Sequence, residues 1–119
     1  MDKRSQEKMI GVDSRLVQVV ELASTLSPVE FIVTEGVRTL ERQKQLFDAK
    51  ASQTMNSKHL VGKAVDLAAK VGGQVRWDWP LYSQLAVAMK QAAKQLNIEI
   101  VWGGDWKTLK DGPHFELKG

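Results

Sequence analysis

The sequence predicts a single α+β domain in which helices pack against a small, mostly antiparallel sheet. A length of 119 residues suits one domain. Hydrophobic residues make up 43% and charged residues 26% of the chain, proportions typical of a globular fold with a core. Segments with helical spacing of apolar residues come between short segments with strand-like alternation, and no internal repeat is found. We therefore expect residues 1–119 to form one domain.

The first half of the chain contains two predicted helices and one predicted strand. Residues 14–26 place apolar side chains at helical spacing, and Asp13 is suited to cap the start of this helix. Strand-like alternation with a β-branched bias predicts a strand over 29–36. A second helix, mostly exposed because its apolar stripe is narrow, is expected directly after Thr39. The small polar residues of 50–58 predict a loop.

The second half contains the remaining strands and the longest predicted helix. The apolar segment 63–69 is followed by a Gly-Gly pair, which predicts a strand that enters a hairpin. A long helix with a regular apolar face is expected after Asp78 as its N-cap, with Asn97 at its C-terminal cap. Short strands are expected over 98–102 and 114–117, separated by a polar loop.

Composition excludes several classes of protein. The absence of cysteine excludes disulfides, thiolate zinc sites and cysteine nucleophiles. The formal net charge is +3, but lysines and arginines are scattered among acids, which argues against nucleic-acid binding. The chain has no run of about 18 apolar residues and no apolar stretch near its start. We therefore expect neither a membrane span nor a signal peptide.

The two histidines are the first candidates for chemistry. His59 and His114 each lie at a predicted junction between loop and strand, close in sequence to a carboxylate. Asp66 lies inside an apolar strand, where an unpartnered buried carboxylate would cost several kcal/mol of stability. A metal ion would supply the partner, and two imidazoles with one carboxylate are a usual ligand set of a catalytic zinc ion. The alternative is two unrelated, hydrogen-bonded imidazoles.

Hydrolysis at such a zinc ion also requires a general base that is not a ligand. Asp111 precedes His114 by three residues, and the Asp-Gly-Pro-His turn would bring its carboxylate within reach. Glu116 is the rival base, because alternation along a strand puts it on the same face as His114. Glu116 could equally accept a hydrogen bond that orients the imidazole.

Two motifs in this region resemble those of a known family. Residues 57–66 fit the pattern S-x-H-x-x-G-x-A-x-D, and residues 111–114 fit D-x-x-H. In order and spacing they resemble the peptidase M15 family, which includes VanY-like zinc D,D-carboxypeptidases, dipeptidases and phage endolysins that act as L-alanyl-D-glutamate peptidases. The endolysin branch is the most similar. The resemblance extends over nearly the whole chain, through residues 35–39, 77–80 and 102–106.

The resemblance implies a fold and a set of site residues. The expected fold is that of hedgehog proteins and D,D-peptidases, as one zinc peptidase domain over residues 1–119 with no separate cell-wall-binding domain. His59, Asp66 and His114 match the ligands of one Zn²⁺ ion, and Asp111 matches the catalytic acid and base. Arg38 matches an arginine near the substrate carbonyl, where a guanidinium would stabilise the developing oxyanion. For Arg38 a surface salt bridge is the alternative.

Other residues are weaker candidates for substrate binding. Ser57 is expected either to bind substrate or to cap the local turn. Trp106 is expected either to form a wall of the cleft or to pack in the core. Trp77 and Trp79 are interpreted as anchors for the start of the long helix, and Trp102 as a core residue.

The function implied by the resemblance is zinc-dependent hydrolysis of peptidoglycan stem peptides at the L-alanyl-D-glutamate bond, as in an endolysin that lyses the host of a phage. One alternative is a D,D- or L,D-carboxypeptidase or dipeptidase, and another is a zinc-stabilised binding module without turnover. We expect a monomer that needs no further cofactor and whose partner is bacterial peptidoglycan. It would be made in the host cytoplasm and reach the cell wall after holin-type release.

Overall fold

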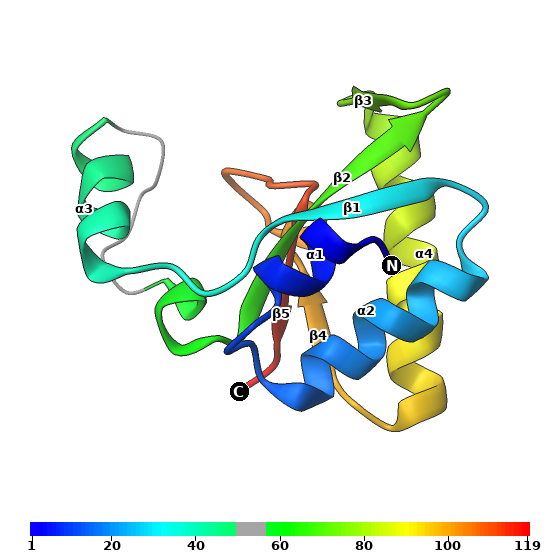
Figure 1. Cartoon of the computed structure of the whole chain (residues 1–119), viewed down its shortest axis with the longest axis horizontal. Coiled ribbons are helices and arrows are strands. Elements are labelled where there is room, and N and C mark those ends of the chain that lie inside the picture. Colours follow the sequence, from blue (N-terminus) through cyan, green and yellow to red (C-terminus); the bar gives the residue numbers. More distant parts are fainter. Residues whose placement is uncertain (50–56) are drawn as a thin grey trace.

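A five-stranded antiparallel sheet lies at the centre of the computed structural model, which describes residues 1–49 and 57–119 (Figure 1). The strand order is β1-β2-β5-β4, and β3 pairs with β2. The strands are β1 (Glu30–Glu35), β2 (Ala64–Val71), β3 (Gln74–Arg76), β4 (Ile100–Trp102) and β5 (His114–Leu117). The helices are α1 (Lys3–Lys8), α2 (Ser14–Leu26), α3 (Leu40–Asp48) and α4 (Trp79–Leu96), with short 3₁₀ helices η1 (Lys58–Val61) and η2 (Gly103–Asp105). This arrangement confirms the predicted fold class.

The hydrophobic core lies between the sheet and the helices α2 and α4 (Figure 1). The apolar stripes of both helices are buried together with Val65 and Leu67 of β2 and Phe115 of β5. Because side chains alternate along a strand, Asp66 points to the opposite face of the sheet. The sheet therefore separates the core from a face on which polar chemistry is possible.

Helix α1 was not predicted from the sequence. It has six residues and lacks an apolar stripe, so periodicity gave no signal for it. Asp2 caps it by accepting a hydrogen bond from Ser5 N at 2.7 Å. The buried Ser5 hydroxyl accepts a hydrogen bond from Val33 N at 2.9 Å, which ties α1 to β1. The helix thereby provides a hydrogen-bond acceptor for a backbone N–H group of the edge strand β1.

Most other predictions of local structure are confirmed, with strand bounds that differ by a few residues. Asn97 ends α4 in the left-handed conformation, and Gly72 and Gly73 form the turn of the β2–β3 hairpin. Asp78 is at the N-cap position of α4, but its side chain makes no capping hydrogen bond and pairs with Arg76 instead. In the described residues, no helix is both long enough and apolar enough to cross a membrane.

Helix α3 begins after Thr39 as predicted, and its one buried residue is polar. Thr39 Oγ1 accepts a hydrogen bond from Arg42 N at 3.1 Å. The apolar residues Leu40 and Phe47 are 65% and 43% exposed, whereas Gln43 is fully buried. The helix is therefore mostly exposed, as expected, but a polar contact rather than an apolar stripe attaches it. Residues 50–56 of the predicted loop lie outside the described residues.

A bulge ends the pairing of β1 with β2. Val33 lies opposite Leu67, but Glu35 lies opposite Asp66, so two steps along β1 match one step along β2. A bulge of this kind re-aims the side chains that follow it. It places Glu35 beside the polar face of β2.

Candidate metal centre

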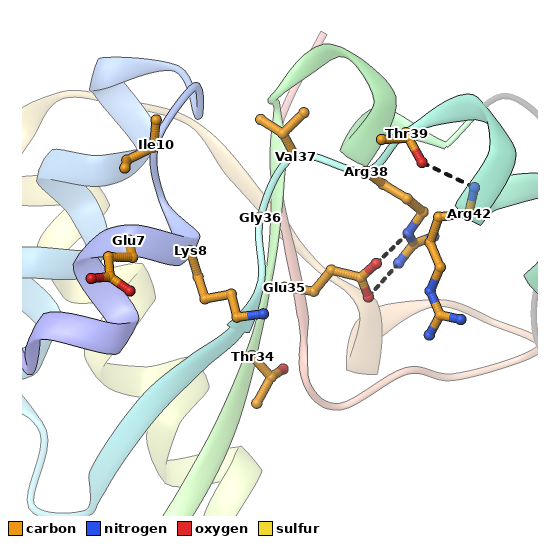
Figure 2. A pocket seen from close by; sticks show the side chains of 10 residues that line it. All are labelled: Glu7, Lys8, Ile10, Thr34, Glu35, Gly36, Val37, Arg38, Thr39 and Arg42. Atoms are coloured by element: carbon orange, nitrogen blue, oxygen red, sulfur yellow. Dashed lines mark hydrogen bonds and ion pairs between the residues drawn. The ribbon is translucent and has the colours of Figure 1, made fainter.

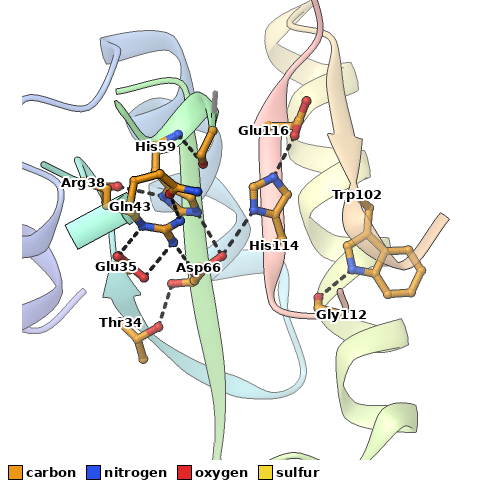
Figure 3. A network of polar contacts seen from close by, with 12 residues as sticks. Thr34, Glu35, Arg38, Gln43, His59, Asp66, Trp102, Gly112, His114 and Glu116 are labelled. Carbon is orange, nitrogen blue, oxygen red and sulfur yellow. Dashed lines mark hydrogen bonds and ion pairs between the residues drawn. The ribbon is translucent and has the colours of Figure 1, made fainter. Parts of the chain in front are cut away.

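Two imidazoles and one carboxylate converge on the polar face of the sheet (Figure 3). Asp66 Oδ1 lies 3.3 Å from His59 Nε2 and 3.4 Å from His114 Nδ1. The three candidate ligand atoms all lie within 4.8 Å of one another. The structure thus brings together the three residues that the sequence predicts as metal ligands.

Each of the three side chains is held by regular backbone structure. Asp66 on β2 is the direct pairing partner of His114 on β5. His59 lies in η1, where Ser57 Oγ accepts a hydrogen bond from His59 N at 3.2 Å. Gly62 ends η1 with a φ of +71°, and a Cβ there would lie 2.5 Å from Gly11 O. Glycine is therefore required for the turn that returns His59 toward Asp66.

Hydrogen bonds on the far side of each ring fix the imidazole tautomers. His59 Nδ1 lies 2.8 Å from the carbonyl oxygen of Gly36, which can only accept, so Nδ1 carries the proton. His114 Nε2 lies 2.7 Å from Glu116 Oε1 and donates to it in the same way. In the neutral imidazoles, which are the forms that bind a metal ion, the lone pairs of His59 Nε2 and His114 Nδ1 are directed toward Asp66. This is the arrangement by which outer hydrogen bonds orient histidine ligands in metal sites.

The donor set fits a metal ion. Among the described residues, His59 Nε2 and Asp66 Oδ1 are the buried side-chain atoms that have no hydrogen-bond partner. Leaving such atoms unsatisfied costs about 1–3 kcal/mol each. A divalent cation would satisfy both atoms and His114 Nδ1 together, and two nitrogens with one oxygen suit zinc with a position left open.

The charges at the centre respond to burial and to one another in the metal-free protein. Burial disfavours the charged carboxylate of Asp66, but the adjacent imidazoles of His114 and His59 outweigh it and lower its pKa. Burial opposes protonation of His114, yet the adjacent carboxylates of Asp66 and Glu116 raise its pKa to about 9. The negative charges of Asp66 and Glu116 thus favour a positive charge at this centre.

Arg38 lies next to Asp66, where its buried side chain forms a network of hydrogen bonds and ion pairs at the end of β1 (Figure 3). Its Nε and Nη2 donate to the two carboxylate oxygens of Glu35 at 2.7 and 2.9 Å. Nη1 donates to Gln43 Oε1 at 2.5 Å, and Nη2 lies 3.7 Å from Asp66 Oδ2. The salt bridge considered as the alternative role of Arg38 is present, but the Arg38 side chain is 8% exposed and that of Glu35 26%, so the pair is partly buried and does not lie at the surface.

The remaining predicted residues surround the cluster. Asp111 is exposed, and its backbone is fixed by hydrogen bonds from Asp111 N to Gly103 O and from His114 N to Asp111 O. Partial burial, and then the negative charge of Asp66, raise the pKa of Asp111. The ring of Trp106 is half-buried, with its centroid 5.1 Å from that of His114.

The positions that three residues take in this network were not predicted from the sequence. Lys58 Nζ contacts Glu116 Oε2 at 2.9 Å and donates to Leu117 O at 2.6 Å. Glu35 and Gln43 hold the Arg38 guanidinium. Glu35 and Lys58 lie inside the motifs described above, within three residues of the candidate site residues Arg38 and His59, and this proximity could have indicated them. Nothing in the sequence distinguishes Gln43 from the other polar residues of its helix.

Fold and site together define a metallopeptidase of the D,D-peptidase fold. The chain belongs to the phage L-alanyl-D-glutamate peptidase family, whose profile matches residues 1–118. An L-alanyl-D-glutamate peptidase of Escherichia phage T5 is 32% identical over 120 residues, which cover 98% of this chain and 87% of the relative.

Solved structures agree with this membership. The L-Ala D-Glu endopeptidase ChiX of Serratia marcescens superimposes with a TM-score of 0.95 and 48% identity, over 99% of this chain and 89% of that one. A mutant of the vancomycin-resistance D,D-pentapeptidase VanY, solved in complex with Zn(II), matches with a TM-score of 0.61 and 20% identity, over 91% of this chain and 73% of that one. The second likeness confirms the predicted fold.

Proposed function

We propose that this chain hydrolyses the L-alanyl-D-glutamate bond of peptidoglycan stem peptides with one zinc ion held by His59, Asp66 and His114. The observation that carries the proposal is the convergence of two imidazoles of fixed tautomer on a buried carboxylate oxygen without a hydrogen-bond partner. When bound, zinc supplies Lewis acidity that polarises the scissile carbonyl and lowers the pKa of a water molecule toward about 7.

Asp111 is the proposed catalytic acid and base. The charges of Asp66, His59 and His114 act on its carboxylate. The pKa of Asp111 is raised, which favours uptake of a proton. It would take the proton of the attacking water and deliver it to the leaving amine. The rival base, Glu116, is occupied by His114 and Lys58, which supports its role as the acceptor that orients His114.

Arg38 is proposed to stabilise the oxyanion that develops on the scissile carbonyl. A guanidinium has five N–H donors, and the hydrogen bonds to Glu35 and Gln43 use three of them. The bidentate contact with Glu35 holds the group in one orientation, so a remaining donor is available without reorganisation.

Ser57 and Trp106 remain proposals for substrate contact. The Ser57 hydroxyl already accepts a hydrogen bond from His59 N, so it would bind substrate as a donor. Trp106 is half-buried, with its ring tilted by 44° against that of His114, and would form the wall of the cleft on the β5 side of the metal centre.

An endopeptidase is favoured over a carboxypeptidase because the chain matches the phage L-alanyl-D-glutamate peptidase family and superimposes on an L-Ala D-Glu endopeptidase. Lys58, a cation that could bind a terminal carboxylate, is paired with Glu116. We place the enzyme in phage lysis as a monomer that acts on the cell wall of the host after holin-type release.

The test is digestion of purified peptidoglycan, with the released fragments identified by mass spectrometry. We expect new N-terminal D-glutamyl ends, lost with a chelator, restored by zinc and absent with Asp111→Ala. Release of terminal D-Ala would instead identify a carboxypeptidase. A folded, zinc-loaded protein that cleaves nothing would contradict the proposal and favour a binding module.

A further inference from the structure

A cavity of about 330 Å³ adjoins the metal centre at the end of β1 (Figure 2). It lies between α1 on one side and the segment from Thr34 to Arg42 on the other. Glu35 and Arg38 line the cavity and also belong to the network that contacts Asp66. The cavity and the metal centre therefore have Glu35 and Arg38 in common, and a group bound in the cavity would lie next to the metal centre.

The charges that line the cavity leave a positive excess. Arg38 and Glu35 form a bidentate ion pair and neutralise each other. Lys8 and Arg42 are exposed, and within residues 1–49 and 57–119 neither side chain forms an ion pair. Glu7 is the one lining carboxylate that is likewise unpaired there. Two cations thus face one anion.

Lys8 and Arg42 approach the cavity from different elements. Figure 2 shows the Lys8 ammonium extending from α1 and the Arg42 guanidinium from α3, on either side of Glu35. The backbone at Arg42 is fixed because Thr39 caps the first turn of α3 and Gln43 anchors that helix to Arg38. Two cations on separate helices thus line one cavity, which favours the binding of an anionic group there.

The chemistry of the proposed substrate supplies such a group, and this step rests on the proposed function. A glutamyl residue has two carboxyl groups, and at most one of them continues the peptide chain. The other is a free carboxylate a few bonds from the scissile nitrogen unless it is amidated. The alanyl residue on the other side of the scissile bond carries only a methyl group. The charged cavity therefore matches the glutamyl side.

We propose that the cavity between α1 and α3 is the subsite for the free carboxylate of the leaving glutamyl residue, bound by Arg42 and Lys8. The leaving peptide then runs toward β1, and the alanyl side runs toward Trp106 and β5. Arg42 is the main determinant, because a guanidinium can bind a carboxylate through two parallel hydrogen bonds. The enzyme would distinguish stem peptides with a free glutamyl carboxylate from those with a carboxamide.

The test uses the zinc-loaded full chain and two synthetic stem peptides that differ only in this group, a carboxylate or a carboxamide. Arg42→Gln, Lys8→Gln and the double variant remove the charges. Lys44→Gln is the matched control, because Lys44 is an exposed cation on α3 that does not line the cavity. For the carboxylate peptide we expect KM to rise about fivefold in Arg42→Gln, about twofold in Lys8→Gln and about tenfold or more in the double variant, with little change in kcat.

The carboxamide peptide separates charge recognition from general damage. We expect wild type to bind it more weakly and the charge variants to leave its KM unchanged, while Lys44→Gln leaves both peptides unchanged. An equal loss for both peptides, or no loss for either, would overturn the subsite.

A binding measurement keeps the subsite distinguishable from the proposed hydrolysis. Calorimetric titration of the glutamyl-side fragment, which needs no turnover, should show affinity that falls in Arg42→Gln. If wild type cleaves neither peptide but binds the fragment in an Arg42-dependent manner, the subsite stands and the hydrolysis fails. If wild type cleaves both peptides and fragment binding is indifferent to Arg42 and Lys8, only the subsite fails.

Discussion

Replacing Glu116 by Gln tests whether an outer hydrogen bond sets the metal affinity of this centre. Glu116 Oε1 accepts from His114 Nε2 at 2.7 Å, and Lys58 holds the other carboxylate oxygen at 2.9 Å. Glutamine keeps the length of the side chain and an acceptor oxygen but removes the charge. A hydrogen bond to a charged acceptor is stronger than one to a neutral acceptor by about 1–1.5 kcal/mol. Because this bond holds His114 as a ligand, we expect the Glu116→Gln variant to bind zinc about tenfold more weakly than wild type.

The assay is competition for zinc between the metal-free protein and a chromophoric chelator, so it does not depend on catalysis. Glu99→Gln is the control, because Glu99 is exposed and its contact with Lys118 spans 3.9 Å. Circular dichroism would establish that both variants fold. A Glu116→Gln protein that is folded and binds zinc as tightly as wild type would refute the argument that this carboxylate strengthens His114 as a ligand.

Three further predictions follow from the site. Asp111→Asn should lower kcat by about 10²–10⁴ while zinc affinity by chelator competition stays within about twofold, and normal turnover would exclude Asp111 as the base. Removal of zinc should abolish peptidoglycan cleavage. It should also lower the free energy of unfolding by about 4 kcal/mol, compared with the protein in free zinc at about 1,000 times its Kd, without changing the far-ultraviolet circular dichroism. Gly62→Ala should weaken both stability and zinc affinity, because a left-handed alanine costs about 1–2 kcal/mol and its Cβ would meet Gly11 O. Gly72→Ala is the control, because φ is +58° there but the space around the position is open, and it should lower thermal stability without changing zinc affinity. Equal zinc affinity in the two variants would contradict the role of Gly62.

The metal centre was predictable from the sequence because its chemistry restricts the residues that can form it. The chain has two histidines, and an aspartate inside an apolar strand requires a partner, so His59, His114 and Asp66 were the economical combination. The apolar faces of α2 and α4 were predictable for a similar reason, since burial imposes a period on the sequence.

The parts that were missed depend on single polar contacts across the fold. Helix α1 is attached through Ser5, and α3 through Gln43, and neither contact produces a periodic pattern. The bulge that sets Glu35 opposite Asp66 is a property of strand pairing and has no local signature in the sequence. Contacts of this kind become visible only when the register of the sheet is known.

The direct pairing of Asp66 with His114 has a consequence for the kinetics of metal uptake. In many small metalloproteins the ligands are scattered in the unfolded chain, so the ion binds and the chain folds in one step. Here two of the proposed ligands are neighbours in an antiparallel ladder, and the third lies in the turn that leads into the same strand. The ligands are therefore assembled by the backbone before any ion arrives. Uptake should then be a bimolecular step whose rate is first order in free zinc and independent of the folding rate.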